Sequence, residues 1–274
     1  MSTAAVEPQP AESAESLARA LTGARRAAAA LPGFPGPIPD ALTLSYAVQE
    51  AGIDLWGDEI VGWKVGRVPD AWQPKLRAER LTGPIFGRNL WQATPGAVTE
   101  FPVFVGGFAA VEAEFVLQVG RDADPAKTEY SLEEAADLVG ALRIGVETAG
   151  SPMAAINDLG PTVVASDFGN NAGLILGGEI PHWRAVMDGL TAETFVEGVS
   201  VGRGGAASLP GGPLAALQFA AGHLAARGRP LKAGQLISTG ASTGIHDIKA
   251  GQSARIDFAP YGEILCRAVP AKGE

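Results

Sequence analysis

The chain has 274 residues, of which 46% are hydrophobic and 19% are charged, a composition typical of a folded globular protein. Its formal net charge of -9, with 21 lysines and arginines and no basic cluster, argues against nucleic-acid partners and anionic membrane surfaces. A single cysteine excludes an internal disulfide and a cysteine-based zinc cluster, and the lack of a long apolar run or secretory signal leads us to expect a soluble, cytoplasmic protein.

The N-terminal part of the chain is predicted to be helical. Residues 1–11 are rich in alanine, glutamate and proline, and we expect them to be disordered. A helix is predicted over 13–30, where Leu31-Pro32-Gly33 ends it, and a second helix over 42–51. These elements predict a small helical region spanning residues 12–58.

The remainder, residues 59–274, is predicted to be a domain of mixed or antiparallel sheet, which makes the fold class α+β. Short runs rich in β-branched and aromatic residues predict strands at 60–65, 83–86, 103–108, 111–119, 235–239, 253–258 and 263–269. Two helices interrupt them, at 132–142 behind the capping residue Ser131 and at 214–226 behind Pro213. The tract Gly202-Arg203-Gly204-Gly205 lacks the spacing of a phosphate-binding loop and predicts a hairpin turn.

Two carboxylates stand two residues apart in the apolar run Val111-Glu112-Ala113-Glu114-Phe115. Successive side chains of a strand point to opposite faces, so Glu112 and Glu114 would project together from one face. Two neighbouring carboxylates repel each other, and burying either of them without compensation is costly. The pair therefore requires either water, as on the exposed face of an amphipathic strand, or a cation.

A third acid, Glu147, is also a lone carboxylate in a mostly apolar run, Leu142-Arg143-Ile144-Gly145-Val146-Glu147. The presence of this third acid favours a cation-binding site over the water-exposed face of an amphipathic strand. Two other groups are candidates for the same site. Lys64 lies between glycines in Gly62-Trp63-Lys64-Val65-Gly66, and is either a surface lysine or an anion-binding or proton-transferring one. His246 follows a loop of small residues and is a candidate acid or base.

These segments resemble the fumarylacetoacetate hydrolase superfamily, and within it the branch of 2-keto-4-pentenoate (2-hydroxypenta-2,4-dienoate) hydratases and 4-oxalocrotonate decarboxylases. The resemblance runs from about residue 15 to residue 270. The segment at 62–66 is similar to the family's G-Y/W-K-I-G, Glu112 and Glu114 to its metal-binding E-x-E, and Glu147 to its third metal carboxylate. The other segments that resemble the family are residues 173–177, 213–217 and 231–240.

The chain departs from the family pattern around the metal ligands. The family's P-D-F/Y-G carries an acid associated with proton transfer, and Ile85 stands in its place. Glu147 is followed by Thr148-Ala149-Gly150-Ser151, without the Asp and Arg of E-x-x-D-S-R. The family's A-D-N-A-S is replaced by the segment 166–170. These departures leave the reaction and its substrate more open than the fold.

The resemblance implies a mixed β-sheet roll, a homo-oligomer and one Mg²⁺ or Mn²⁺ ion held by Glu112, Glu114 and Glu147. A 2-oxo acid would chelate this ion, which would act as a Lewis acid. Lys64 and His246 are the expected catalytic residues, His246 standing in for the acid missing at position 85. The expected substrate-binding residues are Thr243, Gly240 and Asp167.

The implied function is that of a metal-dependent hydratase, a lyase that adds water to a 2-hydroxy-2,4-dienoate from aromatic meta-cleavage catabolism. Three alternatives remain: a 2-oxo acid decarboxylase, an acylpyruvate-type C–C hydrolase, and a non-catalytic 2-oxo acid binding protein. In the family, the hydrolase activity is associated with a water-activating histidine on an N-terminal lid. No histidine precedes His182 in this chain, which favours the lyase.

Overall fold

The computed structural model describes residues 13–274, so the disorder expected of residues 1–11 lies outside the described part. The helices are α1 Ala14–Arg26, α2 Leu42–Trp56, α3 Gln73–Leu76, α4 Leu132–Ala136, α5 Pro161–Ser166, α6 Trp183–Val186 and α7 Gly212–Ala226. The strands are β1 Ile60–Arg67, β2 Arg80–Phe86, β3 Leu90–Gln92, β4 Val98–Val103, β5 Phe108–Val119, β6 Val139–Ser151, β7 Asn171–Glu179, β8 Thr191–Val196, β9 Val199–Gly205, β10 Leu236–Ser238, β11 His246–Asp247, β12 Ser253–Asp257 and β13 Glu263–Pro270.

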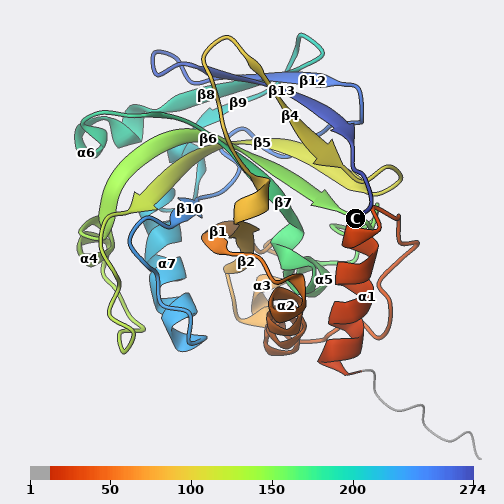
Figure 1. Ribbon diagram of the computed structural model, residues 1–274. Helices are drawn as coiled ribbons and strands as arrows, with labels where there is room; N and C mark the ends of the chain where they lie inside the picture. The colour runs from red at the N-terminus through yellow and green to blue at the C-terminus, as the bar shows by residue number, and fades with distance from the viewer. Residues whose placement is uncertain (1–12) are drawn as a thin grey trace, which may run out of the picture.

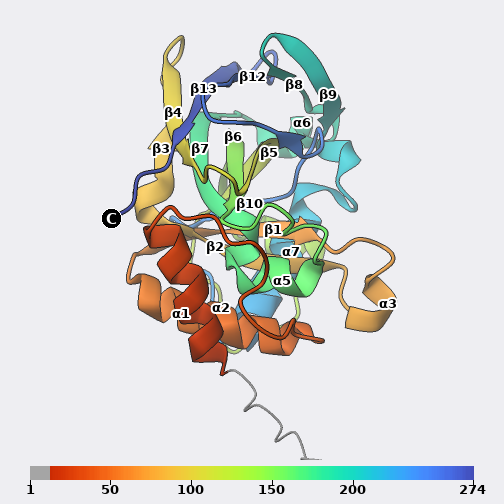
Figure 2. The same ribbon diagram turned by 90° about the vertical axis from the view of Figure 1, so that its right-hand side faces the viewer.

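The strands form two sheets. The larger sheet has the order β2-β1-β10-β5-β6-β7-β3, with β11 paired to β5, and it contains both parallel and antiparallel neighbours. The smaller sheet has the order β4-β13-β12-β8-β9. Figures 1 and 2 show the smaller sheet over one side of the strongly curved larger sheet, with α1 and α2 on the other side. The expected α+β class with a curled mixed sheet is confirmed.

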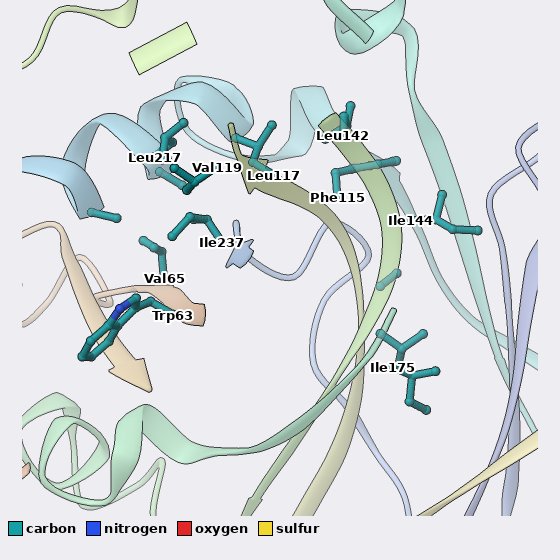
Figure 3. Packing of buried hydrophobic residues seen from close by; sticks show 14 of the residues in the cluster. Trp63, Val65, Phe115, Leu117, Val119, Leu142, Ile144, Ile175, Leu217 and Ile237 are labelled. Atoms are coloured by element: carbon teal, nitrogen blue, oxygen red, sulfur yellow. The ribbon is translucent and has the colours of Figure 1, made fainter. Parts of the chain in front are cut away.

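Strand β5 sorts its side chains between two environments. Val111, Phe115 and Leu117 are fully buried in the largest hydrophobic cluster, which also contains residues of α7 and of the smaller sheet. Figure 3 shows Leu217 of α7 beside Leu117 and Val119 of β5. The alternate positions of β5 face the other way and include the two glutamates. On this face, Phe108 packs against a cluster with residues of α1, α2 and α5.

The first helix is anchored to the sheet through a buried ion pair. Leu17 and Leu21 of α1 pack in a second hydrophobic cluster with Met153. Arg25, near the end of α1, lies 2.6 Å from Asp167 and donates to the backbone carbonyl oxygen of Gly150. Removal of one partner of such a pair leaves an uncompensated buried charge, so this contact fixes α1 to β6 and to the segment after α5.

The helix predicted over 132–142 ends at Ala136, a turn follows at 137–138, and Val139 begins strand β6. Val139 pairs with Val119, and a Cβ added at Gly140 would lie 2.8 Å from the Cα of Gly120, so the two strands approach closely at this end. Cross-strand pairing therefore overrides the helix-forming composition of the segment.

The glycine tract 202–205 is not the predicted turn, because it forms part of strand β9. The hairpin of β8 and β9 turns instead at Glu197 and Gly198, which both have positive φ. A Cβ at Gly204 would lie 1.9 Å from the carbonyl oxygen of Ser242, so the glycine allows the loop after β10 to pack directly on β9.

No helix within residues 13–274 combines the length and the apolar character that a membrane crossing requires. The division into a helical region over 12–58 and a catalytic domain over 59–274 stays a prediction.

Candidate metal centre and its cavity

Three glutamates meet on one face of the larger sheet. Glu112 of β5 lies directly opposite Glu147 of β6 in the antiparallel register, and Glu114 is the next residue of β5 on the same face. One carboxylate oxygen of each residue lies within 4.8 Å of the others. Glu112 is 5% exposed, and the other two are fully buried. The three side chains therefore form one buried acidic cluster, as the strand alternation indicated.

The cluster is electrostatically unfavourable without a counter-charge. Burial, together with the repulsion of Glu147, raises the pKa of Glu112 to about 8, against the lowering effect of Lys64. Burial and the charges of Glu147 and Glu112 raise the pKa of Glu114 well above its ordinary value. Both shifts express the cost of holding several carboxylates in a desolvated space, and a cation among them would remove that cost.

The free oxygens of the cluster show how a cation would be held. Glu114 accepts the backbone N–H of Gly240 at one oxygen, 2.8 Å away, while its other oxygen is buried without a hydrogen-bond partner. Glu147 accepts the Nδ2 of Asn171 at 2.9 Å, and its second oxygen is likewise buried and unpartnered. Buried polar atoms without partners are rare, and carboxylate oxygens suit hard divalent cations. The donor set fits Mg²⁺, Mn²⁺ or Ca²⁺.

Lys64 faces the acidic cluster from β1. Its Nζ lies 3.4 Å from an oxygen of Glu147, and the residue is 7% exposed. Burial by itself would lower the pKa of Lys64, but the attraction of Glu147, Glu112 and Glu114 outweighs it and raises the pKa. A buried cation thus stands beside the carboxylates, and it offsets only part of their combined charge.

A cavity of 760 Å³ opens onto these groups. Lys64, Glu112 and Glu147 line its inner part, together with Gly240 from the loop after β10. Residues of the β1–β2 hairpin, of α5 and of the segment 208–210 complete its walls. Its volume is that of a small-molecule binding site.

His246 and Thr243 lie elsewhere, which differs from the expected placement near the carboxylates. His246 pairs with Val111, so strand alternation directs it to the face of β5 opposite Glu112. Its Nε2 contacts the Thr243 hydroxyl at 3.2 Å, and that hydroxyl lies 2.8 Å from the Thr194 hydroxyl of β8. The two residues therefore connect the loop to the smaller sheet. Asp247, one residue further on, lines the cavity in place of His246.

Asp167 also differs from its expected placement, because its side chain is buried and fully engaged by protein. One carboxylate oxygen pairs with Arg25 and the other accepts the Ser151 hydroxyl at 2.6 Å. Asp167 is not among the residues that line the cavity. Its contacts with Arg25 and Ser151 connect α1 to β6. Gly240, the third expected substrate-binding residue, does line the cavity.

Ile85 lies on the same face of the sheet as Lys64 but carries no polar group. It pairs with Gly62 in the β1–β2 register, and Lys64 is the next residue of β1 on that face. Ile85 is fully buried and packs with Val116 and Leu174. Ile85 does not line the cavity, so position 85 supplies only apolar packing on this face of the sheet.

Proteins similar in sequence to this chain are named 2-keto-4-pentenoate hydratase. One from Burkholderia vietnamiensis is 29% identical over 223 residues, which cover 78% of this chain and 82% of that protein. One from Paraburkholderia xenovorans is 28% identical over 245 residues, covering 88% of this chain and 87% of that protein. No family model matches the chain.

Solved structures share its fold. The 4-oxalocrotonate decarboxylase from Pseudomonas putida G7, complexed with calcium and acetate, superimposes with a TM-score of 0.76 at 20% identity, covering 93% of this chain and 97% of that one. The fumarylpyruvate hydrolase from Pseudomonas aeruginosa, in complex with Mn²⁺ and pyruvate, has a TM-score of 0.56 at 17% identity, covering 76% and 89%. The resemblance to the fumarylacetoacetate hydrolase superfamily and to its hydratase and decarboxylase branch is confirmed.

The metal-free protein is predicted to lose stability as the pH rises from 4.5 to about 8. The pKa of Glu112 is about 8 in the folded protein, against its ordinary value of 4.5. The contribution of this carboxyl group to the free energy of unfolding is therefore fully present below pH 4.5, and it is lost as the pH rises through about 8. The loss should be on the order of a few kcal/mol in urea unfolding of chelator-treated protein. Glu112→Gln should abolish this component, and saturating Mg²⁺ should suppress it. Identical pH profiles for the wild type and Glu112→Gln would contradict the prediction.

Proposed function

We propose that this protein is a metal-dependent hydratase that adds water to a 2-hydroxy-2,4-dienoate. The observation that carries the proposal is the buried cluster of Glu112, Glu114 and Glu147, with two unpartnered oxygens, beside Lys64 in a cavity large enough for a small acid. The sequence similarity to proteins named 2-keto-4-pentenoate hydratase supports the same reaction.

The three glutamates would hold one Mg²⁺ or Mn²⁺ ion. When bound, such an ion supplies a Lewis acid that polarises the 2-oxo group of a chelating substrate and stabilises the negative charge that develops there. Gly240 and Asn171 each hold one carboxylate by a hydrogen bond, and the second oxygen of each carboxylate, which has no hydrogen-bond partner, would be available to ligate the ion. Partners of this kind keep ligands in position and tune the site.

Lys64 would bind the carboxylate of the substrate or move a proton at Nζ. Its ammonium lies 3.4 Å from Glu147 and faces the cavity, which suits a group that binds the anionic end of a substrate. The apolar cluster around Ile85 leaves no acid on that side. Proton transfer therefore depends on Lys64 and on groups that line the cavity, and His246 does not line it.

The lining of the cavity favours a lyase over a C–C hydrolase that uses a histidine to activate water. The chain has three histidines, His182, His223 and His246, all within residues 13–274, and none of them lines the cavity. A decarboxylase would exploit the same stabilised negative charge, and a binding protein would retain only the chelating site. The assay described below distinguishes both of these alternatives from a hydratase.

We also propose a homo-oligomer located in the cytoplasm, with a small 2-oxo or 2-hydroxydienoate acid as its ligand and with no nucleic acid or membrane as partner. The net charge of -9 supports the last point, because the protein would repel phosphate-rich surfaces.

The proposal predicts that ultraviolet absorbance of 2-hydroxypenta-2,4-dienoate decreases in the presence of protein and Mg²⁺, and that a chelator stops the decrease reversibly. The product should contain one added water by mass spectrometry. Release of CO₂ from an oxalocrotonate-type acid, without hydration, would identify a decarboxylase. Binding of the dienoate without turnover would identify a binding protein, and either result would overturn the hydratase.

Lys64→Ala is predicted to lower kcat/KM by about tenfold or more, because a charged contact worth about 1.4 kcal/mol or more to the transition state is lost. Lys232→Ala is the matched control, since Lys232 forms an exposed ion pair with Asp122 away from the cavity. Equal kinetics for the two variants would exclude Lys64 from the reaction.

A further inference from the structure

Asp247 brings a fourth carboxylate to the wall of the cavity. It lies on β11 directly opposite Ala110 of β5, and opposite residues of an antiparallel pair direct their side chains to the same face. Ala110 is two residues from Glu112 on that face, a separation of about 7 Å along the strand. Both Asp247 and Glu112 line the cavity. Asp247 is therefore near the acidic cluster, but it is not one of the three carboxylates that converge there.

The backbone on both sides of Asp247 is held to β5. The N–H of Ser242 donates to the carbonyl oxygen of Ala113 at 2.8 Å, and the N–H of Ile248 donates to the carbonyl oxygen of Ala109 at 3.0 Å. The side chain of Ile248 is buried, so the chain is anchored one residue beyond Asp247. A carboxylate on a backbone that is fixed in this way keeps its position relative to the cluster, as acid–base chemistry requires.

The carboxylate of Asp247 is not engaged by another group of the protein. Two other acids of the cavity wall have a charged neighbour, since Glu147 lies 3.4 Å from Lys64 and Glu79 lies 4.0 Å from Arg80. Within residues 13–274, the carboxylate of Asp247 has no hydrogen-bond or ion-pair partner, and the residue is exposed. It is therefore available to a molecule that occupies the cavity.

We propose that Asp247 is a catalytic base, which takes a proton from the water that adds to the substrate. This inference rests on the proposed function. A 2-oxo acid chelates an ion through its carboxylate and 2-oxo oxygens, whereas the water adds at C4, two bonds beyond the carbonyl carbon. The group that activates this water must stand close to the glutamate cluster without being one of the ligands. Asp247 meets both conditions.

In the step assigned to Asp247, the substrate is the 2-oxo-3-enoate tautomer of the dienoate. The oxygen of water forms a bond to C4, and the electron pair of the C3=C4 bond moves through C2 onto the 2-oxo oxygen. One proton of the water passes to the carboxylate of Asp247. The carboxyl group then returns this proton to C3 as the 2-oxo group re-forms, which yields a 4-hydroxy-2-oxo acid and restores the carboxylate.

Two acids that differ by one hydroxyl group provide a test that requires no turnover. Titration calorimetry with the Mg²⁺-loaded protein compares 4-hydroxy-2-oxopentanoate, the expected product, with 2-oxopentanoate. In the wild type the C4 hydroxyl should donate to the carboxylate of Asp247 and tighten binding by about tenfold, as a hydrogen bond to a charged group would give. Asp247→Ala should bind the two acids equally, with the wild-type affinity for 2-oxopentanoate.

The kinetics of an isosteric variant measure the proton transfer itself. Asp247→Asn should lower kcat for the dienoate by about a hundredfold, because general base catalysis is lost, and should leave KM and the affinity for Mn²⁺ unchanged. Asp54→Asn is the matched control, since Asp54 of α2 has a side chain that is 82% exposed and does not line the cavity. It should bind both acids and turn over as the wild type does.

The outcomes separate the role of Asp247 from the proposed function. Equal affinity of the wild type for the two acids, or an unchanged kcat in Asp247→Asn, would overturn the role of Asp247 and leave the hydratase intact. A lower affinity of Asp247→Asn for Mn²⁺ would also overturn it, because Asp247 would then belong to the metal site. Failure of both acids to bind to the wild type would overturn the chelating site, and the role of Asp247 with it.

Discussion

The charge of three buried carboxylates is the constraint on which the rest of this structure depends. Glu112, Glu114 and Glu147 are brought together by strand pairing. Among residues 13–274, Lys64 is the one cation within ion-pairing distance of the cluster. The raised pKa values of Glu112 and Glu114 show that this compensation is incomplete. The arrangement becomes favourable when a divalent cation joins it, which makes metal binding the simplest physical reason for its existence.

Much of this could be predicted from the sequence, because strand alternation is a local property. The spacing of Glu112 and Glu114 predicted a shared face, and the third acid, Glu147, favoured a cation site over an exposed strand face. The helices at the N-terminus and at α7 followed from their composition and their end signals. What could not be predicted depends on pairing between distant segments. Residues 139–142 are compatible with a helix, and only their register with β5 makes them a strand.

The same limit explains the residues that were misplaced or missed. A shift of one residue in the register of β11 decides whether His246 or Asp247 faces the cavity, and nothing in the local sequence fixes that register. Asn171, which orients Glu147, and Arg25, which engages Asp167, act from 24 and 142 residues away from their partners. No spacing rule connects such pairs, so sequence patterns alone gave no signal for them.

The most direct test of this account is the titration of chelator-treated protein with Mn²⁺ or Mg²⁺, followed by calorimetry. The account predicts one bound ion per chain in the wild type. It also predicts that Glu114→Gln weakens binding by about a hundredfold or more, since loss of residues that merely orient a ligand already costs 10–100-fold. Glu100→Gln, in which an exposed glutamate of β4 is changed, should bind as the wild type does. A wild-type protein that binds no divalent ion, or a Glu114→Gln variant with unchanged affinity, would contradict the account.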